Sequence, residues 1–294
     1  MFFYAILMIL VHLQLQNHTS AKISRKYDAA NHVVSIINHD SDCYTQGLTF
    51  NDGFLYESCG LNGKSNIRKV NPVTGEVLQK LKLSDEYFAE GLVVIHDYIY
   101  VLTWTSQCML VIDKNSFQLL GKYRYQTHSG EGWGLTYDGK QFIASDGSSR
   151  ISFFDVPDTK KLGKLGFFVE TLKKSREIIV RDSSKKEVNL LNELEYLPDG
   201  HVYANVWYKD FILKINLQDG SVSEILDLHL LYPHKLRSKT ADCLNGIAYN
   251  TTDNTILLTG KLWPQYYKIK VFPSSSRERL LKSRSSNGSG IVDL

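Results

Sequence analysis

One acidic residue, Glu90, stands at a repeated position of the sequence where the equivalent residues carry an amide or an indole. A carboxylate surrounded by aromatic side chains loses solvation, which raises its pKa towards the range useful for proton transfer at neutral pH. Glu90 is therefore the first candidate for acid–base chemistry. Two plainer roles compete with this one, namely a buried ion pair with Lys261 and a cap at the end of a strand.

The repeat that contains Glu90 has five copies. They are QGLTF (46–50), EGLVV (90–94), WGLTY (133–137), NELEY (192–196) and NGIAY (245–249). Each copy is followed by a turn such as NDG (51–53) or PDG (198–200), and then by aromatic and β-branched residues, which is the pattern of a β-hairpin. The copies lie roughly 40 to 60 residues apart, which is the length of a four-stranded propeller blade. The sequence therefore predicts an all-β fold, a five-bladed β-propeller, rather than a sandwich of unrelated strands.

The fifth unit has three strands instead of four. The segment NHVVSIIN (31–38) precedes the first unit and can supply the missing strand, which would close the ring and remove an exposed sheet edge. We expect the propeller domain to cover 31–272. An insertion rich in Lys and Arg, 158–187, is expected to form a solvated loop and an edge strand, and 229–238 a short helix.

The first strand of each propeller blade lines the central channel, so the repeated position forms a ring at one mouth. That ring consists of Gln46, Glu90, Trp133, Asn192 and Asn245. The ends of the second strands add Trp104, Asn205, Trp207, Lys261 and Trp263. Polar groups beside indoles suit a small polar ligand. In this interpretation all four tryptophans line a pocket, whereas packing inside the blades is the alternative for each of them.

Composition and motifs exclude several classes of protein. The chain has 34 basic and 31 acidic residues, and this near balance gives no electrostatic argument for nucleic-acid binding. Aromatic residues make up 12% of the chain, which excludes disorder as its main state. The sequence contains no nucleophile-elbow, zinc-protease, P-loop or dinucleotide motif. No metal ligand set or cofactor is therefore predicted for catalysis.

The two ends of the chain differ in composition from the repeats. Residues 2–11 are apolar without interruption, which is too short for a membrane span of about 20 residues but matches a signal-peptide core. We expect 1–21 to be a signal peptide, or else a retained anchor, and the protein to be secreted, in the secretory pathway or anchored in its lumen. Residues 273–294 have the composition of a flexible tail.

Entry into the secretory pathway would allow cysteines to pair. Cys43 and Cys243 precede equivalent strands of the first and fifth blades, which are neighbours in a closed ring. The sequence therefore suggests a bridge between these two residues.

The motifs resemble those of the plant and bacterial type of glutaminyl-peptide cyclotransferase, typified by the papaya enzyme. The matching stretches are YTQGL (44–48), ESCGLNGKSNIRKV (57–70), FAEGL (88–92), LTW (102–104), GEGWGLTYDGK (130–140), ASDGSSRI (144–151), LNELEY (191–196), YANVW (203–207), LNGIAYN (244–250) and LTGKLWP (258–264). This resemblance implies an enzyme that converts the N-terminal Gln of peptides and proteins to pyroglutamate and releases ammonia, without a metal. It places the catalytic glutamate at Glu90. The supporting residues fall on Gln46, Phe88, Trp104, Trp133, Asn192, Trp207 and Lys261.

The chemistry also fits the residues themselves. One carboxylate can take a proton from the attacking α-amine and return it to the leaving nitrogen, while Lys261 or the amides stabilise an oxyanion. The main alternative is a non-catalytic propeller that binds a small amine, sugar or peptide in the channel mouth. A second is a hydrolase that uses a channel cation, although a purely structural channel cation is compatible with the cyclase. We expect a monomer whose partners are peptides and proteins with an N-terminal Gln, with no membrane partner beyond the anchor.

Overall fold

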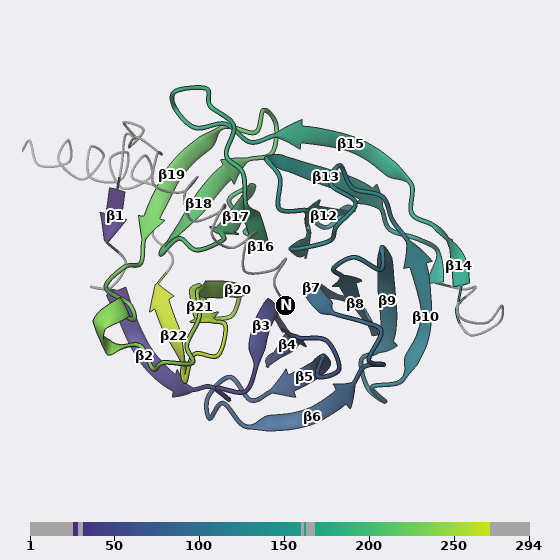
Figure 1. The fold of residues 1–294 in the computed structure, drawn as a ribbon, viewed down its shortest axis with the longest axis horizontal. Helices are drawn as coiled ribbons and strands as arrows, with labels where there is room; N and C mark the ends of the chain where they lie inside the picture. The colour runs from purple at the N-terminus through teal and green to yellow at the C-terminus, as the bar shows by residue number, and fades with distance from the viewer. Residues whose placement is uncertain (1–25, 29–31, 160–161, 163–167, 271–294) are drawn as a thin grey trace, which may run out of the picture.

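The computed structural model describes residues 26–28, 32–159, 162 and 168–270, and its five sheets stand around a central axis (Figure 1). The all-β, five-bladed propeller predicted from the repeat is confirmed. The segments 1–21 and 273–294, expected to be a targeting segment and a tail, lie outside the described residues, as do the last residues of the predicted 31–272 domain. Among the described residues, no helix is both long enough and apolar enough to cross a membrane.

Each blade is a four-stranded antiparallel meander. Blade 1 contains β3 (Tyr44–Asn51), β4 (Phe54–Gly60), β5 (Asn66–Val70) and β6 (Val77–Lys82). Blade 2 contains β7 (Ala89–Ile95), β8 (Tyr98–Thr103), β9 (Cys108–Asp113) and β10 (Leu119–Arg124). Blade 3 contains β11 (Leu135–Tyr137), β12 (Gln141–Ser145), β13 (Arg150–Asp155) and β15 (Lys174–Ile179). Blade 4 contains β16 (Leu191–Tyr196), β17 (His201–Val206), β18 (Phe211–Asn216) and β19 (Val222–Asp227).

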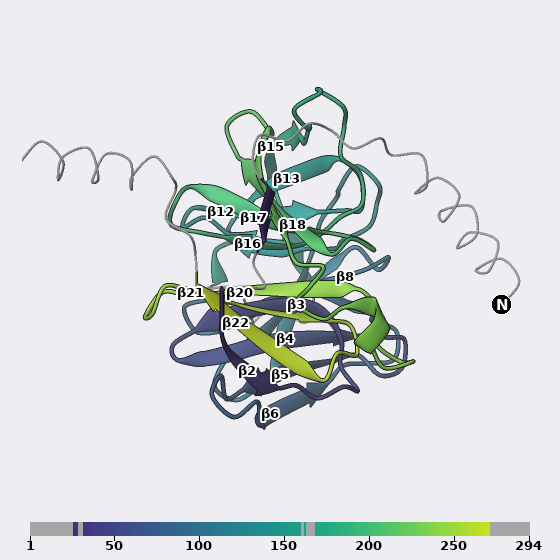
Figure 2. The same cartoon turned by 90° about the vertical axis from the view of Figure 1, so that its left-hand side faces the viewer.

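Blade 5 joins the two ends of the described chain. Its strands are β20 (Leu244–Asn250), β21 (Thr255–Gly260), β22 (Gln265–Lys270) and β2 (Val33–Asn38). Strand β2 pairs antiparallel with β22, so that Ile37 lies opposite Tyr266. The purple strand β2 and the yellow strand β22 are side by side in Figure 1, and they face the viewer in Figure 2. The predicted ring closure by an N-terminal strand is therefore confirmed.

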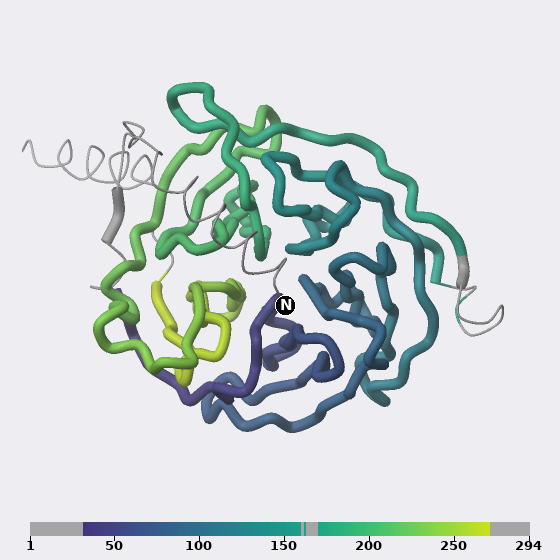
Figure 3. Tube along the Cα trace, viewed as in Figure 1, coloured from purple at the N-terminus to yellow at the C-terminus, as the bar shows by residue number. Residues whose placement is uncertain are grey.

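The basic insertion contributes two strands. Strand β14 (Phe168–Thr171) pairs parallel with β10 at the edge of blade 2, and β15 is the outer strand of blade 3. A further strand, β1 (Lys26–Asp28), which the sequence did not predict, adds to the edge of blade 4. The short helix expected in 229–238 is the 3-10 helix η3 (His234–Leu236). The path of β15 along the outside of blade 3 can be followed in Figure 3.

In blades 1, 2 and 3 the inner strands approach so closely that the second residue of the repeat must be small. A β-carbon on Gly91 would lie 2.3 Å from the backbone nitrogen of Leu135 in the next blade. Blade 4 has Glu193 at this position instead, and its fully buried carboxyl group accepts hydrogen bonds from the backbone N–H groups of Leu48 (3.3 Å) and Ile247 (2.9 Å). Glu193 therefore ties blade 4 to blades 1 and 5 at the hub.

The described cysteines pair differently from the prediction. Cys43 forms a disulfide with Cys59, and Cys108 and Cys243 are free and buried. The predicted bridge between Cys43 and Cys243 is wrong, because Cys59 lies across the β3–β4 hairpin, opposite Thr45. Paired strands of a hairpin stay at disulfide distance, so the register of β3 and β4 decides the partner of Cys43.

Candidate active site

The first strands of four blades are irregular at the ring position. The pairing register shifts between Thr45 and Gly47, between Ala89 and Leu92, between Leu191 and Leu194, and between Leu244 and Ile247. A bulge of this kind re-aims a side chain and is frequent beside active sites. Gln46, Glu90, Asn192 and Asn245 all lie within these shifts. The repeat in the sequence is thus a repeated bulge in the structure.

Glu90 lies at the hub, with 4% of its surface exposed. The side-chain amide of Gln46 donates a hydrogen bond to Glu90 Oε1 at 3.1 Å. Asn245 Nδ2 in turn donates to the backbone oxygens of Thr45 (3.0 Å) and Gln46 (3.3 Å). Blades 5 and 1 therefore contribute two successive amides that hold the Glu90 carboxyl group of blade 2.

The electrostatics of Glu90 suit a proton carrier. Burial raises the pKa of Glu90 well above its ordinary value, the charge of Glu131 raises it further, and the charge of Lys261 lowers it. Lys261 is itself buried, and its Nζ lies 4.7 Å from the centroid of the Tyr44 ring. Within the described part of the chain Lys261 forms no ion pair, so it acts on Glu90 through space rather than by direct contact.

Aromatic side chains form a continuous wall next to these groups. The rings of Phe88 and Trp104 meet edge to face at 5.6 Å, and those of Trp133 and Trp207 at 5.5 Å. Tyr208 extends the wall, with its ring 4.7 Å from that of Trp207. Phe88, Trp104, Trp133 and Trp207 are all only partly buried. The structure therefore brings the predicted aromatic residues together.

Glu131 joins the two halves of this wall, a contact that sequence reasoning missed. Its Oε2 accepts hydrogen bonds from the indole N–H groups of both Trp104 and Trp133, each at 2.8 Å. The residue stands two positions before Trp133 in the motif GEGWG. This spacing puts Glu131 close to the ring position, but it does not reveal that the carboxylate is shared by two indoles.

Four buried polar atoms in this region have no hydrogen-bond partner among the residues that the structure describes. They are Asn192 Oδ1, Asn245 Oδ1, Asn205 Nδ2 and Trp207 Nε1. Buried polar groups are nearly always paired in proteins, and leaving one unpaired costs about 1 to 3 kcal/mol. These two acceptors and two donors are complementary to a ligand that carries both carbonyl and N–H groups.

Trp207 and Lys261 are positioned by two backbone turns of the same type, one in blade 4 and one in blade 5. Each follows the end of a second strand, and the next residue, Tyr208 (φ 58°) or Leu262 (φ 59°), has a left-handed conformation. This conformation costs a residue with a β-carbon about 1 to 2 kcal/mol. Such strain is typical of residues that position functional side chains.

Trp263 does not belong to the site. It is 1% exposed, packs in the hydrophobic core between blades 4 and 5, and donates its indole N–H to Asp242 O at 2.8 Å. The prediction that all four tryptophans line the pocket is therefore wrong for Trp263. The reason is Gly260, where a β-carbon would lie 2.3 Å from the indole, so the glycine leaves room for the ring to fold back against the strand.

One cluster of possible metal ligands lies near the disulfide. The ligand atoms of His39, Cys43 and Glu57 lie within 4.8 Å of one another. Cys43 is bonded to Cys59, however, and His39 Nε2 is 2.9 Å from Glu57 Oε1. This cluster is thus already committed to internal bonds, and no metal ligand was predicted there.

Comparisons with known proteins identify the family of the chain. Residues 5–271 match the family model described as glutamine cyclotransferase. A curated glutaminyl-peptide cyclotransferase from Arabidopsis thaliana is 36% identical over 248 residues, covering 83% of this chain and 72% of the relative. The crystal structure of glutaminyl cyclase from Myxococcus xanthus superimposes with a TM-score of 0.69 at 28% identity, covering 81% of this chain and 95% of that one. The fold and the cyclotransferase function predicted from the sequence are confirmed, and the chain belongs to the glutamine cyclotransferase family.

Proposed function

We propose that Glu90 is the single proton shuttle of a metal-independent cyclisation of N-terminal Gln. The observation that carries this proposal is a buried carboxyl group with a raised pKa, held by Gln46, at the same end of the hub as the unpartnered donors and acceptors. Such a carboxyl group can exchange protons near neutral pH.

The reaction requires one proton to move twice. The neutral α-amine attacks the γ-carbonyl carbon of its own side chain, and the Glu90 carboxylate accepts the proton that the amine loses. The protonated Glu90 then gives this proton to the amide nitrogen, the bond between carbon and that nitrogen breaks, and ammonia leaves. The product is a five-membered lactam, and Glu90 returns to its starting state.

The negative charge that develops on the γ-carbonyl oxygen of the substrate must be stabilised by hydrogen-bond donors. Lys261, Asn205 Nδ2 and Trp207 Nε1 are suited to this role, since the two neutral donors have no partner in the described part of the protein. Preorganised donors of this kind stabilise an oxyanion without any reorganisation during the reaction. Asn192 Oδ1 and Asn245 Oδ1 are suited to accept the N–H groups of the amine and the amide.

The aromatic wall holds the substrate in a folded conformation. Cyclisation requires the flexible Gln side chain to bend back on its own amine, and enclosure by rings reduces the entropy lost at that step. In this mechanism Glu131 is a positioning residue, because it fixes the orientation of Trp104 and Trp133 rather than contacting the substrate.

The proposal includes no metal in the chemical step, and a structural cation in the channel would not alter it. The disulfide between Cys43 and Cys59 supports an oxidising compartment. We accordingly propose a monomer in the secretory pathway, secreted or anchored in the lumen, that acts on peptides and proteins with an N-terminal Gln.

Ammonia release from a Gln-initiated peptide tests the mechanism. Glu90→Gln should reduce kcat by about 10²- to 10⁴-fold, whereas Glu195→Gln, a matched change at another buried hub carboxyl group, should not. Chelator should leave the wild-type rate unchanged. Near-normal activity of a folded Glu90→Gln protein would eliminate the shuttle, and binding of the peptide without ammonia release by the wild type would favour the non-catalytic alternative.

A further inference from the structure

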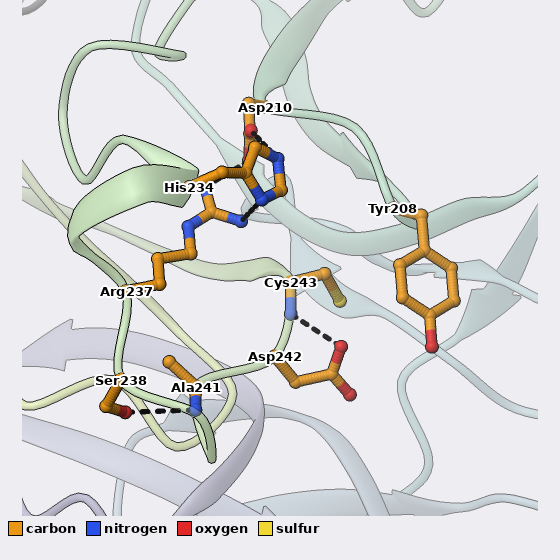
Figure 4. Close-up of a pocket in the computed structure, with 8 residues that line it drawn as sticks. All are labelled: Tyr208, Asp210, His234, Arg237, Ser238, Ala241, Asp242 and Cys243. Carbon is orange, nitrogen blue, oxygen red and sulfur yellow. Dashed lines mark hydrogen bonds and ion pairs between the residues drawn. The ribbon is translucent and has the colours of Figure 1, made fainter.

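A pocket of about 260 Å³ lies beside the candidate active site (Figure 4). Tyr208 stands on one side, Asp210, His234 and Arg237 on the other, and Asp242 between them. This volume is slightly below the range of roughly 300 to 1,000 Å³ that is typical of pockets for whole ligands. The pocket therefore suits one side chain of a longer molecule.

The pocket begins where the candidate active site ends. Its residue Tyr208 packs against Trp207, the last indole of the aromatic wall, with the two rings tilted by 35°. Its residue Asp242 accepts a hydrogen bond from the Tyr44 hydroxyl group at 2.9 Å, and Lys261 lies over the ring of the same tyrosine. The backbone N–H of Asp242 also donates to Lys261 O at 2.9 Å. A peptide whose first residue is held at Glu90 has these two residues beside its path.

One of the charged residues that line the pocket, Asp242, has no oppositely charged partner among the described residues. Arg237 is paired with Asp210 at 2.6 Å, donates to Tyr232 O, and has a side chain only 7% exposed. Asp242, by contrast, has only neutral partners, the Tyr44 hydroxyl group and the backbone N–H of Cys243. Within the described residues no basic group makes an ion pair with Asp242, so its charge is available to a ligand.

Tyr208 supplies the second feature of the pocket. It is 40% exposed, although it is a large aromatic residue, and it is held there by its left-handed backbone. An exposed ring next to an unneutralised carboxylate suits the apolar stem and charged head of Lys or Arg.

We infer that this pocket is a specificity subsite for the residue that follows the N-terminal Gln, with a preference for Lys or Arg at that position. The inference rests on the proposed function, since it assumes that the first residue of the peptide is held at Glu90. It names the substrate class as peptides that begin with Gln followed by a basic residue.

The test compares kcat/KM for Gln-Lys-Ala-amide and Gln-Glu-Ala-amide. We expect a ratio of about fivefold or more at low ionic strength, as for a modest ion pair. The ratio should shrink as salt rises to about 1 M, because the Debye length falls to about 3 Å. Asp242→Asn should bring the ratio close to one, and Tyr208→Ala should lower it. Asp52→Asn, the same change on the exposed β3–β4 turn at the far end of blade 1, should leave it unchanged.

Equal rates for the two peptides in the wild type, or a ratio that Asp242→Asn does not alter, would overturn the subsite. Calorimetry with the two pyroglutamyl products gives the same comparison without turnover, and tighter binding of the Lys product is expected. These results are independent of Glu90→Gln. An active Glu90→Gln protein overturns the shuttle and leaves the subsite intact, whereas equal product affinities overturn the subsite and leave the shuttle intact.

Discussion

Gln46 donates a hydrogen bond to Glu90 across the seam between blades 1 and 2, at 3.1 Å from Nε2 to Oε1. The two residues occupy the same position in consecutive repeats, and each lies in a bulge of its first strand. A donated hydrogen bond stabilises the charged form of a carboxyl group, whereas burial opposes it. The proton affinity of Glu90 therefore depends on groups contributed by other blades.

The acidic limb of the pH–rate profile should report this balance. Since the carboxylate is the active base, kcat/KM should rise with pH through the raised pKa of Glu90. Lys261→Met removes a charge that lowers this pKa, so the limb should move to higher pH. Glu131→Gln removes a charge that raises it, so the limb should move to lower pH. If the acidic limb moved in the same direction in both variants, the assignment of Glu90 would be contradicted. The alkaline limb, which reflects the substrate amine, serves as the internal control.

The indole N–H of Trp207 should matter for rate and not for stability. It has no partner within the described ranges of the chain, so Trp207→Phe removes a donor without breaking a hydrogen bond seen in the fold. We expect kcat to fall by about 10²-fold, the lower end for loss of an oxyanion donor, with little change in Tm. Trp263→Phe is the contrast, because its N–H is bonded to Asp242 O and its loss should lower Tm. An unchanged kcat for Trp207→Phe would remove this residue from the oxyanion site.

The disulfide should stabilise the β3–β4 hairpin beside the site. Cys43 and Cys59 close a loop of 16 residues, for which a contribution of about 3 kcal/mol is expected. The double variant Cys43→Ser/Cys59→Ser should therefore unfold at lower urea concentration and lose its sensitivity to reductant. Cys108→Ala should keep that sensitivity, since Cys108 is free. Non-reducing mass spectrometry that found Cys43 joined to Cys243 would refute the pairing.

Glu195 should make stability depend on pH. Burial raises its pKa from 4.5 to about 8, so the folded state favours the neutral form. Its contribution to stability is then complete below about pH 4.5 and is lost as the pH rises through about 8. Glu195→Gln keeps a neutral group at this position at every pH. In this variant the free energy of unfolding should therefore fall less between pH 4.5 and 8 than in the wild type. The difference is expected to be a few kcal/mol in total, on the order of one kcal/mol per pH unit. Urea titrations at pH 5, 7 and 8.5 would measure this, and parallel curves for the two proteins would contradict it.

The ring of the site could be predicted from the sequence because it is periodic. Gln46, Glu90, Trp133, Asn192 and Asn245 recur at one position of the repeat, and the propeller geometry then brings them together. The same argument placed Trp207 and Lys261 at the ends of second strands.

Contacts between side chains from different blades have no such period. Glu131 accepts two indole N–H groups that are far apart in the sequence, and Asp242 meets Tyr44 across the closure of the ring. The two errors have the same origin. Trp263 was grouped with the other tryptophans by position, and Cys243 with Cys43 by blade equivalence, whereas Gly260 and the hairpin register decide their actual partners.

The pairing of β2 with β22 also has a consequence for synthesis of the chain. The last described strand pairs with one of the first, so the circle can be completed only after β22 has left the ribosome. Lys261 and Asn245 belong to that last blade and are translated late. A nascent chain that stops at blade 4 therefore has the glutamate and most of the indoles but neither of these two polar groups, and should be inactive until blade 5 is made.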